Sequence, residues 1–182
     1  MGRRRSKNGF RDYRRARNRL RRLGDLMLFC VLAGGLLYAV AHLPEDTAEG
    51  SVRIIDGDSF HVGDREVRLI GIDAPEAKQT CRDEVAAEWP CGRDATRMLR
   101  DLTKNRAVTC TGSADDKYGR LLARCMAGDL DLNAEMVRRG FAVSSAQQDF
   151  AYSAEEREAR DAKRGLWRGA FENPHEWRAA RK

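Results

Sequence analysis

The stretch SVRIIDGDSFHVGDREVRLIGI, residues 51–72, decides the fold. It contains three runs rich in strand-forming residues, at 51–55, 59–62 and 66–72, and two turn sequences, DGD and GD, separate them. In the third run, the side chains alternate between the two faces of an extended chain, so that Val67 and Leu69 share one face and Arg68 and Ile70 share the other. Short alternating runs bounded by Asp and Gly are typical of strands joined by tight turns. The stretch therefore predicts a meander of three strands.

Downstream of this meander, the pattern predicts two further strands and three helices. The helices have apolar residues at helical spacing. The predicted elements are a helix at 93–105, strands at 107–111 and 121–126, and helices at 132–141 and 151–163, with Gly165 as the C-cap of the last. This order fits an α+β fold that is mainly β, the five-stranded Greek-key barrel called the OB-fold, with three helices. We expect the folded domain to cover residues 51–168.

Residues 26–43, LMLFCVLAGGLLYAVAHL, contain no acidic or basic side chain except a histidine. As a helix they would be about 27 Å long, close to the hydrocarbon thickness of a bilayer. The sequence therefore predicts one transmembrane signal anchor before the domain, in contact with membrane lipid. Two alternatives stay open: a buried core helix, and a signal peptide cleaved after Ala41, which would release a secreted domain.

The charge of the chain is divided unevenly. Residues 1–25 hold eleven Lys and Arg and two acidic residues, a net charge of +9, whereas the rest of the chain holds 23 basic and 26 acidic residues, a net charge of −3. The positive-inside rule places this basic tail in the cytoplasm and the domain outside it, in the periplasm or at the cell surface. The high net charge of the whole chain therefore says little about the domain, where a polyanion site must be local.

Two short segments complete the domain organisation. Residues 44–50, PEDTAEG, are expected to form a polar linker between the membrane segment and the domain. Residues 169–182 form a C-terminal extension with Phe171, Pro174 and Trp177, which we expect to pack back on the domain and to end in a loose basic tip.

Four of the five cysteines lie in the domain, and Cys30 lies in the apolar segment. An even number in an oxidising compartment indicates two disulfides. Cys81 and Cys91 bracket a short stretch, and Cys110 and Cys125 lie on the two strands that flank DDKYGR, so we predict the pairs Cys81–Cys91 and Cys110–Cys125. The alternative is four buried free thiols. The sequence has no CxxC motif or Cys/His cluster of a zinc site, and its three histidines are scattered.

Three motifs carry the candidate chemistry: IDGDS at 55–59, VRLIGIDAPE at 67–76 and DKYGR at 116–120. Taken singly, each is common, since DGD is usually a solvated turn and an isolated strand arginine usually faces water. Together they supply three carboxylates and two arginines. Carboxylate oxygens suit Ca²⁺ or Mg²⁺, and guanidinium groups bind phosphate oxygens in a bidentate manner. No covalent nucleophile is evident, so the combination favours phosphoryl transfer to water.

In order and spacing, the series DGDS, VRLIGIDAPE, DKYGR, LNAEMVRRGFA, AEEREAR and GLW resembles the staphylococcal nuclease (thermonuclease) family over residues 51–167. The resemblance implies the OB barrel with three helices. It also implies a calcium-dependent phosphodiesterase that cuts DNA or RNA at the P–O5′ bond and leaves 3′-phosphate ends.

The resemblance also implies a calcium site. Asp58 and Asp73 correspond to the metal-binding carboxylates, and Ala74 corresponds to the residue whose backbone carbonyl binds the metal. Family members often have Thr in place of Ala74 and of Ser59, and a carbonyl ligand does not need the hydroxyl. Asp56 is expected to belong to the turn rather than to the metal site.

The remaining roles concern the phosphate and the attacking water. Glu76 corresponds to the general base that orients water, and Arg68 and Arg120 correspond to the arginines that stabilise the phosphate in the transition state. Lys117 and Tyr118 resemble the residues that bind the terminal phosphate and the base of the nucleotide.

Three functions remain as alternatives. The first is an active nuclease that acts on DNA, RNA or both, a monomer with no protein partner. The second is a nucleic-acid-binding module of the same fold that has lost catalysis, and the third is a membrane-tethered structural or adaptor protein. The presence of all five motif side chains favours the first. Calcium follows from the resemblance, whereas the carboxylates alone would also accept Mg²⁺ or Mn²⁺.

Overall fold

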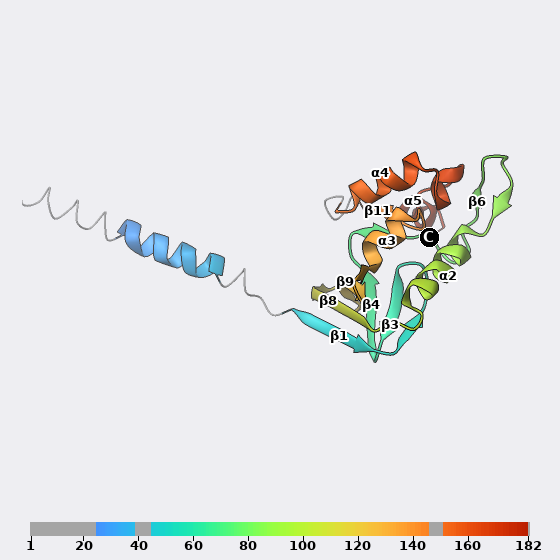
Figure 1. Cartoon of the computed structure of the whole chain (residues 1–182). Coiled ribbons are helices and arrows are strands. Elements are labelled where there is room, and N and C mark those ends of the chain that lie inside the picture. Colours follow the sequence, from blue (N-terminus) through green and yellow to red (C-terminus); the bar gives the residue numbers. More distant parts are fainter. Residues whose placement is uncertain (1–24, 39–44, 146–150, 182) are drawn as a thin grey trace, which may run out of the picture. The chain divides into compact units, whose positions relative to one another are not determined.

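The computed structural model describes residues 25–38, 45–145 and 151–181 of the chain (Figure 1). The chain divides into two compact units, Met1–Pro44 and Glu45–Lys182. The larger unit contains all strands of the described ranges and the residues of the three motifs.

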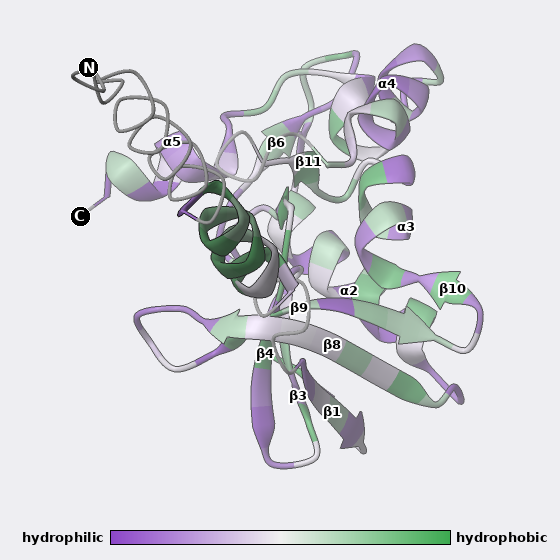
Figure 2. Cartoon of the chain, turned by 90° about the vertical axis from the view of Figure 1, so that its left-hand side faces the viewer, coloured by the Kyte–Doolittle hydropathy of each residue, from purple (hydrophilic) through white to green (hydrophobic). Residues whose placement is uncertain are grey.

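Residues 25–38 of the smaller unit form a helix of 14 residues whose side chains are mostly exposed. Figure 2 shows this helix as largely hydrophobic. Within the described ranges, no helix combines the length and the apolar character needed to span a bilayer. The predicted anchor, 26–43, includes residues 39–43, which lie outside the described part of the chain.

The main sheet follows the path β1-β8-β9-β4-β3-β2, and β10 pairs with β9. Its strands are β1 (Asp46–Gly50), β2 (Val52–Ile54), β3 (Ser59–Val62), β4 (Arg65–Leu69), β8 (Val108–Asp115), β9 (Leu121–Ala127) and β10 (Leu130–Asp131). All neighbours are antiparallel except β4 and β9. Because β1 and β2 lie at opposite ends of the path but are separated only by Ser51, the sheet curls into a half-barrel (Figure 1).

The predicted meander is confirmed as β2, β3 and β4. Its alternation places Phe60, Val62, Val67 and Leu69 in the core, where each is at most 1% exposed. The other two predicted strands correspond to β8 and β9, and β8 continues four residues beyond its predicted end at Thr111. The alternation of apolar and polar residues therefore located the central strands.

The expected linker at 44–50 contains strand β1 instead. Its sequence, DTAEG, has one β-branched residue and two acids, so intrinsic strand propensity is weak. Ala48, opposite Cys110 in the register with β8, is the single buried side chain of β1. Pairing with a neighbouring strand, which is a long-range effect, therefore overrides the local signal.

The three predicted helices correspond to α2 (Cys91–Thr103), α3 (Leu132–Arg138) and α4 (Ser153–Asp161). Helix α3 is shorter than expected, because the chain turns at Gly140, whose backbone N–H donates to the carbonyl of Val137 (2.8 Å).

The C-terminal segment contains two helical elements that were not predicted, η2 (Gly165–Arg168) and α5 (Pro174–Ala179). Gly165 was expected to be the C-cap of α4 but is the first residue of η2. The first residue after α4 in the left-handed region is Lys163 (φ 51°). The extension packs back on the domain as expected, through Phe171 and helix α5. Helix α5 ends at Ala179, and Lys182 of the predicted loose basic tip lies outside the described residues.

Two clusters of buried side chains hold the larger unit together. The main cluster lies between the sheet, α2 and α3, and includes Phe60, Leu99, Leu121 and Met136, all 0% exposed. The second is smaller and packs residues of the C-terminal segment against two short sheets. Those sheets pair β5 (Ile72–Asp73) with β11 (Val143–Ser144) and β6 (Cys81–Arg82) with β7 (Glu88–Trp89).

Both predicted disulfides are confirmed. Cys81–Cys91 joins β6 to the first residue of α2, and Cys110–Cys125 links directly opposite residues of β8 and β9 within the main cluster. Cys30 is the one free cysteine of the described residues, and it is exposed.

Candidate active site

Asp58 is placed by the turn that precedes β3. The Asp56 side chain accepts a hydrogen bond from the backbone N–H of Asp58 (3.1 Å), which confirms Asp56 as a turn residue. Gly57 lies so close to its neighbours that an added Cβ would be 2.7 Å from the Cβ of Ala74 and 2.9 Å from that of Ala95. The turn is thus pressed against the Ala74 strand end and helix α2, and a side chain at Gly57 would displace Asp58.

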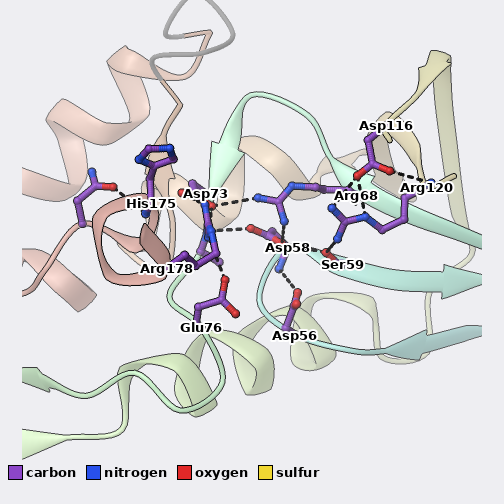
Figure 3. A network of polar contacts seen from close by, with 12 residues as sticks. Asp56, Asp58, Ser59, Arg68, Asp73, Glu76, Asp116, Arg120, His175 and Arg178 are labelled. Atoms are coloured by element: carbon purple, nitrogen blue, oxygen red, sulfur yellow. Dashed lines mark hydrogen bonds and ion pairs between the residues drawn. The ribbon is translucent and has the colours of Figure 1, made fainter. Parts of the chain in front are cut away.

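One guanidinium joins the two predicted metal-binding carboxylates (Figure 3). Nη1 of Arg68 donates to Oδ1 of Asp58 (2.7 Å), and Nη2 donates to Oδ1 of Asp73 (3.0 Å). The other oxygen of Asp58 accepts from the backbone N–H of Ala74 (2.9 Å). Both aspartates are buried, at 3% and 6% exposure. The strand ends therefore bring Asp58, Arg68 and Asp73 together as the sequence predicted.

Burial is the dominant influence on Asp58, and it raises the pKa of this carboxyl to about 7. Arg68 opposes the shift by favouring the ionised form, whereas the neighbouring charges of Asp56 and Asp73 add to it. A second cation near Asp58 would favour the carboxylate further, so the environment fits a group that binds a metal ion.

Glu76 lies in the loop after β5, and its backbone is fixed on both sides. Its carbonyl accepts from the N–H of Gln79 (2.7 Å), and its N–H donates to the side-chain oxygen of Gln79 (3.2 Å). Gln79 is 0% exposed and also donates to the carbonyl of Glu172 (2.7 Å). Gly92 of α2 packs directly on this loop, since an added Cβ would lie 1.7 Å from the Glu76 carbonyl oxygen. The Glu76 carboxylate itself stays partly exposed, at 33%.

The C-terminal helix α5 brings an arginine into the site that sequence reasoning missed (Figure 3). Arg178 donates to both oxygens of Asp73 (2.9 and 2.8 Å) and to Glu76 (2.9 Å). Burial favours the neutral form of this guanidinium, but the bonds and charges of Asp73 and Glu76 outweigh burial and raise the pKa of Arg178.

The helix that carries Arg178 has a start signal in the sequence. The side chain of Asn173 accepts from the N–H of His175 as the N-cap, and Pro174 occupies the first turn. Asn followed by Pro is a common beginning of a helix. This signal indicates α5, but nothing in the sequence indicates which carboxylates its arginine reaches.

Arg120 lies immediately before β9 and is held by Asp116. Its Nε and Nη2 both donate to Oδ2 of Asp116 (2.8 and 2.6 Å), and its Nη1 donates to Oγ of Ser59 (3.3 Å). Burial raises the pKa of Asp116, but the hydrogen bonds from Arg120 and Tyr118 outweigh it, and the net pKa lies below the usual value. Ser59 also donates to Asp58 (3.0 Å), so a hydroxyl connects Arg120 to the aspartates.

Lys117 and Tyr118 occupy the exposed turn before Arg120. Tyr118 is 72% exposed, and its ring lies 5.0 Å from Nζ of Lys117 and 5.4 Å from the guanidinium carbon of Arg120. The structure thus places both residues beside Arg120, at the rim of the site rather than within the carboxylate network.

The predicted metal-binding set consists of two carboxylates rather than a full cage. In the described ranges, no three His, Cys, Asp or Glu side chains surround a common point at which a metal ion would bind. Asp58 and Asp73 nevertheless contact the same guanidinium, and Ala74 is adjacent to both. Two carboxylates, one carbonyl and several waters form an oxygen set that fits a hard divalent cation.

The chain was compared with known proteins. The family described as Staphylococcal nuclease homologue matches residues 66–169. The succinoglycan biosynthesis protein ExoI of Rhizobium meliloti is 31% identical over 127 residues, which cover 68% of this chain and 66% of that protein. An uncharacterized endonuclease of Escherichia coli is 38% identical over 126 residues, 65% of this chain and 76% of that protein. The micrococcal nuclease of Shigella flexneri is 35% identical over 149 residues, which cover 72% of this chain and 80% of that protein.

The matched range contains most of the site, from β4 to η2, and ends before α5. The chain spans about two thirds of the length of the first of these relatives and about three quarters of the second. With a family match over more than half of its residues, this chain belongs to the staphylococcal nuclease homologue family and is a hydrolase of the nuclease class.

Proposed function

We propose that the protein is a calcium-dependent nuclease that hydrolyses phosphodiester bonds of DNA, RNA or both. The observation that carries this proposal is the close association of four predicted side chains, those of Asp58, Arg68, Asp73 and Glu76. Arg68 joins Asp58 to Asp73, and a single nitrogen of Arg178 lies 2.9 Å from both Asp73 and Glu76. The proposed metal ligands and the proposed general base are therefore connected through shared guanidinium groups.

Asp58, Asp73 and the backbone carbonyl of Ala74 would hold the cation. Bound calcium supplies positive charge for a non-bridging phosphate oxygen and a fixed position for water. The family relationship favours calcium, while the same oxygen ligands would accept Mg²⁺ or Mn²⁺. Two protein carboxylates leave room for the waters that the reaction needs.

The side chains of this chain then divide the work on the phosphate. Glu76, partly exposed and held by its backbone, accepts a proton from the attacking water. Arg68 and Arg120 donate to the equatorial oxygens as negative charge grows there. Lys117 and Tyr118, at the exposed rim, would contact the terminal phosphate and the base of a nucleotide.

We infer that the curled sheet is an OB-type barrel. In support, β2, β3 and β4 form a meander, β4 runs parallel to β9, and β8 returns to β1, which continues directly into β2. Barrels of this kind use one face for nucleic acid. We expect the protein to act as a monomer.

We also propose that residues 26–43 anchor the protein in a membrane, with residues 1–25 in the cytoplasm and the nuclease outside it. The two disulfides support an oxidising compartment for the domain. Cleavage after Ala41 would instead release it. A phosphatase reporter fused after residue 50 that is inactive in intact cells would contradict this orientation, and the size of the mature protein distinguishes anchor from cleaved signal.

The decisive experiment measures hydrolysis of single-stranded DNA and of RNA by the purified protein with calcium, magnesium, manganese or EGTA, beside Glu76→Gln. Calcium-dependent cleavage that the variant loses would support the nuclease and its base. Near-normal turnover by the variant at saturating calcium would remove Glu76 from this role.

The second candidate is a nucleic-acid-binding module without catalysis. The occupation of Asp73 and Glu76 by Arg178 is the observation that favours it, because a permanent ion pair would block the site. DNA binding without cleavage under all metal conditions would support this alternative.

A further inference from the structure

The C-terminal extension contacts the proposed metal site at its centre. Arg178 donates to Oδ1 and Oδ2 of Asp73 and to Oε1 of Glu76, while Arg68 donates to Oδ1 of Asp73 as well. Both oxygens of Asp73 therefore already have cationic partners. A metal ion that binds Asp73 would have to displace Arg178, because this guanidinium occupies both carboxylate oxygens of Asp73, whereas Arg68 contacts only one.

The extension is firmly attached before α5 but not along it. Ala170 and Arg82 exchange two backbone hydrogen bonds (2.8 and 3.0 Å), and Glu172 accepts from buried Gln79 (2.7 Å). In α5, which has six residues, Pro174 alone is buried. The contacts of α5 with the site thus depend largely on Arg178, so the helix can leave while the preceding segment stays in place.

We propose, on the basis of the proposed nuclease function, that Arg178 is an intramolecular occupant of the cation site, so that docked α5 and the divalent ion bind in a mutually exclusive manner. In the docked state, the guanidinium neutralises Asp73 and Glu76 and occupies Oε1 of the proposed base. Binding of the ion releases α5. The apparent metal affinity is then reduced by the docked fraction, as for any ligand that binds one of two states. The helix that carries Arg178 lies outside the range of the family match.

The test compares calcium binding by the full-length protein, Arg178→Gln and Arg181→Gln, measured by titration calorimetry. Arg181 is a matched control, because it follows α5 but stacks on Trp177 and pairs with Glu172 instead of the site. We expect Arg178→Gln to lower the calcium Kd at least tenfold and Arg181→Gln to leave it within twofold. Hydrogen exchange at residues 174–180 should accelerate in the unaltered protein when calcium is added.

Equal calcium affinity in the protein and Arg178→Gln, or weaker binding by the variant, would overturn this inference alone, since calcium would still bind. Absence of calcium binding in both would overturn the proposed metal dependence as well. Unchanged exchange of α5 on calcium addition would show that the helix and the ion coexist, which also contradicts the inference.

A separate observation concerns helix α2, which carries basic residues from the active site to a groove at its other end. The N-terminal turn of α2 touches the Glu76 loop through Gly92. Exposed basic residues then recur at helical spacing on one face: Arg93, Arg97, Arg100 and Lys104. This row covers about 16 Å at the rise of an α-helix.

The row ends in a groove of about 670 Å³ between β2 and the end of α2. Arg53, Arg100, Lys104 and Arg106 line it together with one acid, Asp101. No ion pair involves these four cations in the described part of the chain. The concentration of positive charge is notable because the chain after residue 25 has a net charge of −3.

We infer that the α2 row and this groove form a second contact surface for the backbone of a nucleic-acid strand that extends from the active site; this inference also rests on the proposed function. None of the described residues that line the groove is aromatic, so binding there would be electrostatic and independent of sequence.

The test uses the charge-matched pairs Arg100→Gln/Lys104→Gln and Arg157→Gln/Lys163→Gln, the latter exposed on or after α4. Each is combined with Glu76→Gln, and binding of a 20-nucleotide DNA is measured against salt. Loss of two phosphate contacts should lower the slope of log K against log salt by roughly 1.4 for the first pair only. Hydrolysis of a dinucleotide by the same pairs with Glu76 intact should not change.

Equal DNA affinity and salt slope in the two pairs would overturn this second inference. Loss of binding to vesicles containing phosphatidylglycerol, with DNA binding intact, would assign the groove to a membrane surface instead. If neither the parent protein nor any of these variants binds DNA, the proposed function fails together with this second inference.

Discussion

The two arms of the active site, one carrying Glu76 and the other Arg120, each contain a disulfide but differ in how they are built. The Arg120 arm is a long ladder between β8 and β9, and its disulfide lies in the main cluster, where both sulfurs are buried. The Glu76 arm is a loop followed by a short hairpin, β6–β7, whose strands have two residues each. The Cys81–Cys91 disulfide and the hydrogen bonds of Gln79 hold this arm in place. One arm is positioned by the core, and the other by a few local links.

This difference leads to different expectations for the same chemical change. Where a sheet and a core already fix the geometry, a cross-link adds mainly to stability. Where a loop carries the catalytic group, a cross-link also fixes the position of that group. Four experiments can test the distinction.

The largest effect is expected from Arg120→Gln, which leaves the ladder intact but removes the phosphate-stabilising guanidinium. We expect kcat to fall by about 10²–10³-fold, the usual loss for one preorganised donor. Arg124→Gln serves as control, because Arg124 is an exposed arginine in the adjoining strand β9 that pairs with Asp131 instead of the site. Equal activity of the two variants in a steady-state assay would remove Arg120 from the transition state.

The next largest effect concerns stability of the ladder arm. Replacing Cys110 and Cys125 by alanine should lower the free energy of unfolding by about 2–4 kcal/mol, because the unfolded chain gains freedom and a fully buried contact is lost. At a temperature where the variant stays folded, kcat should remain within about threefold. Urea denaturation and a steady-state assay on the same preparation provide the free energy of unfolding and kcat.

The loop arm should respond in the opposite way. With alanine at Cys81 and Cys91, we expect kcat to decrease about tenfold, because a small displacement of a catalytic group has a large kinetic effect. The loss of unfolding free energy should be smaller than for the ladder pair, since the second cluster is smaller. A variant that loses stability but keeps full activity at low temperature would show that Gln79 alone positions Glu76.

The last effect is a pH dependence of stability. The folded-state pKa of Asp58, raised to about 7, exceeds its ordinary value of 3.8, so this group contributes stability that is present below pH 4 and is lost as the pH rises through 7. Without metal, the free energy of unfolding should therefore decline between about pH 4 and pH 7, by at most about 1.4 kcal/mol per pH unit. Asp58→Asn should lack this component. Parallel pH profiles of the two proteins would contradict the assignment.

The sequence predicted what depends on local pattern. The alternation around Val67 located the central strands, the DGD turn placed Asp58, and cysteines on adjacent strands indicated their pairing. It missed features that depend on contacts between distant segments. Strand β1 has a polar sequence and is defined by its pairing with β8, Gln79 is recognisable only from its buried position, and the target of Arg178 lies about 100 residues earlier in the chain.

The closure of the sheet also determines an order of events during synthesis. Ala48 pairs with Cys110, so β1 has no neighbour on its β8 side until residue 112 has emerged, whereas Cys81 and Cys91 are ten residues apart and can meet early. Long-range strand pairing is slow because it must wait for loop closure. We expect a nascent chain stalled at residue 100 to contain an accessible β1 segment in limited proteolysis, and a chain stalled beyond the exit of β9 to protect it. The first strand of the domain is thus among the last to be incorporated.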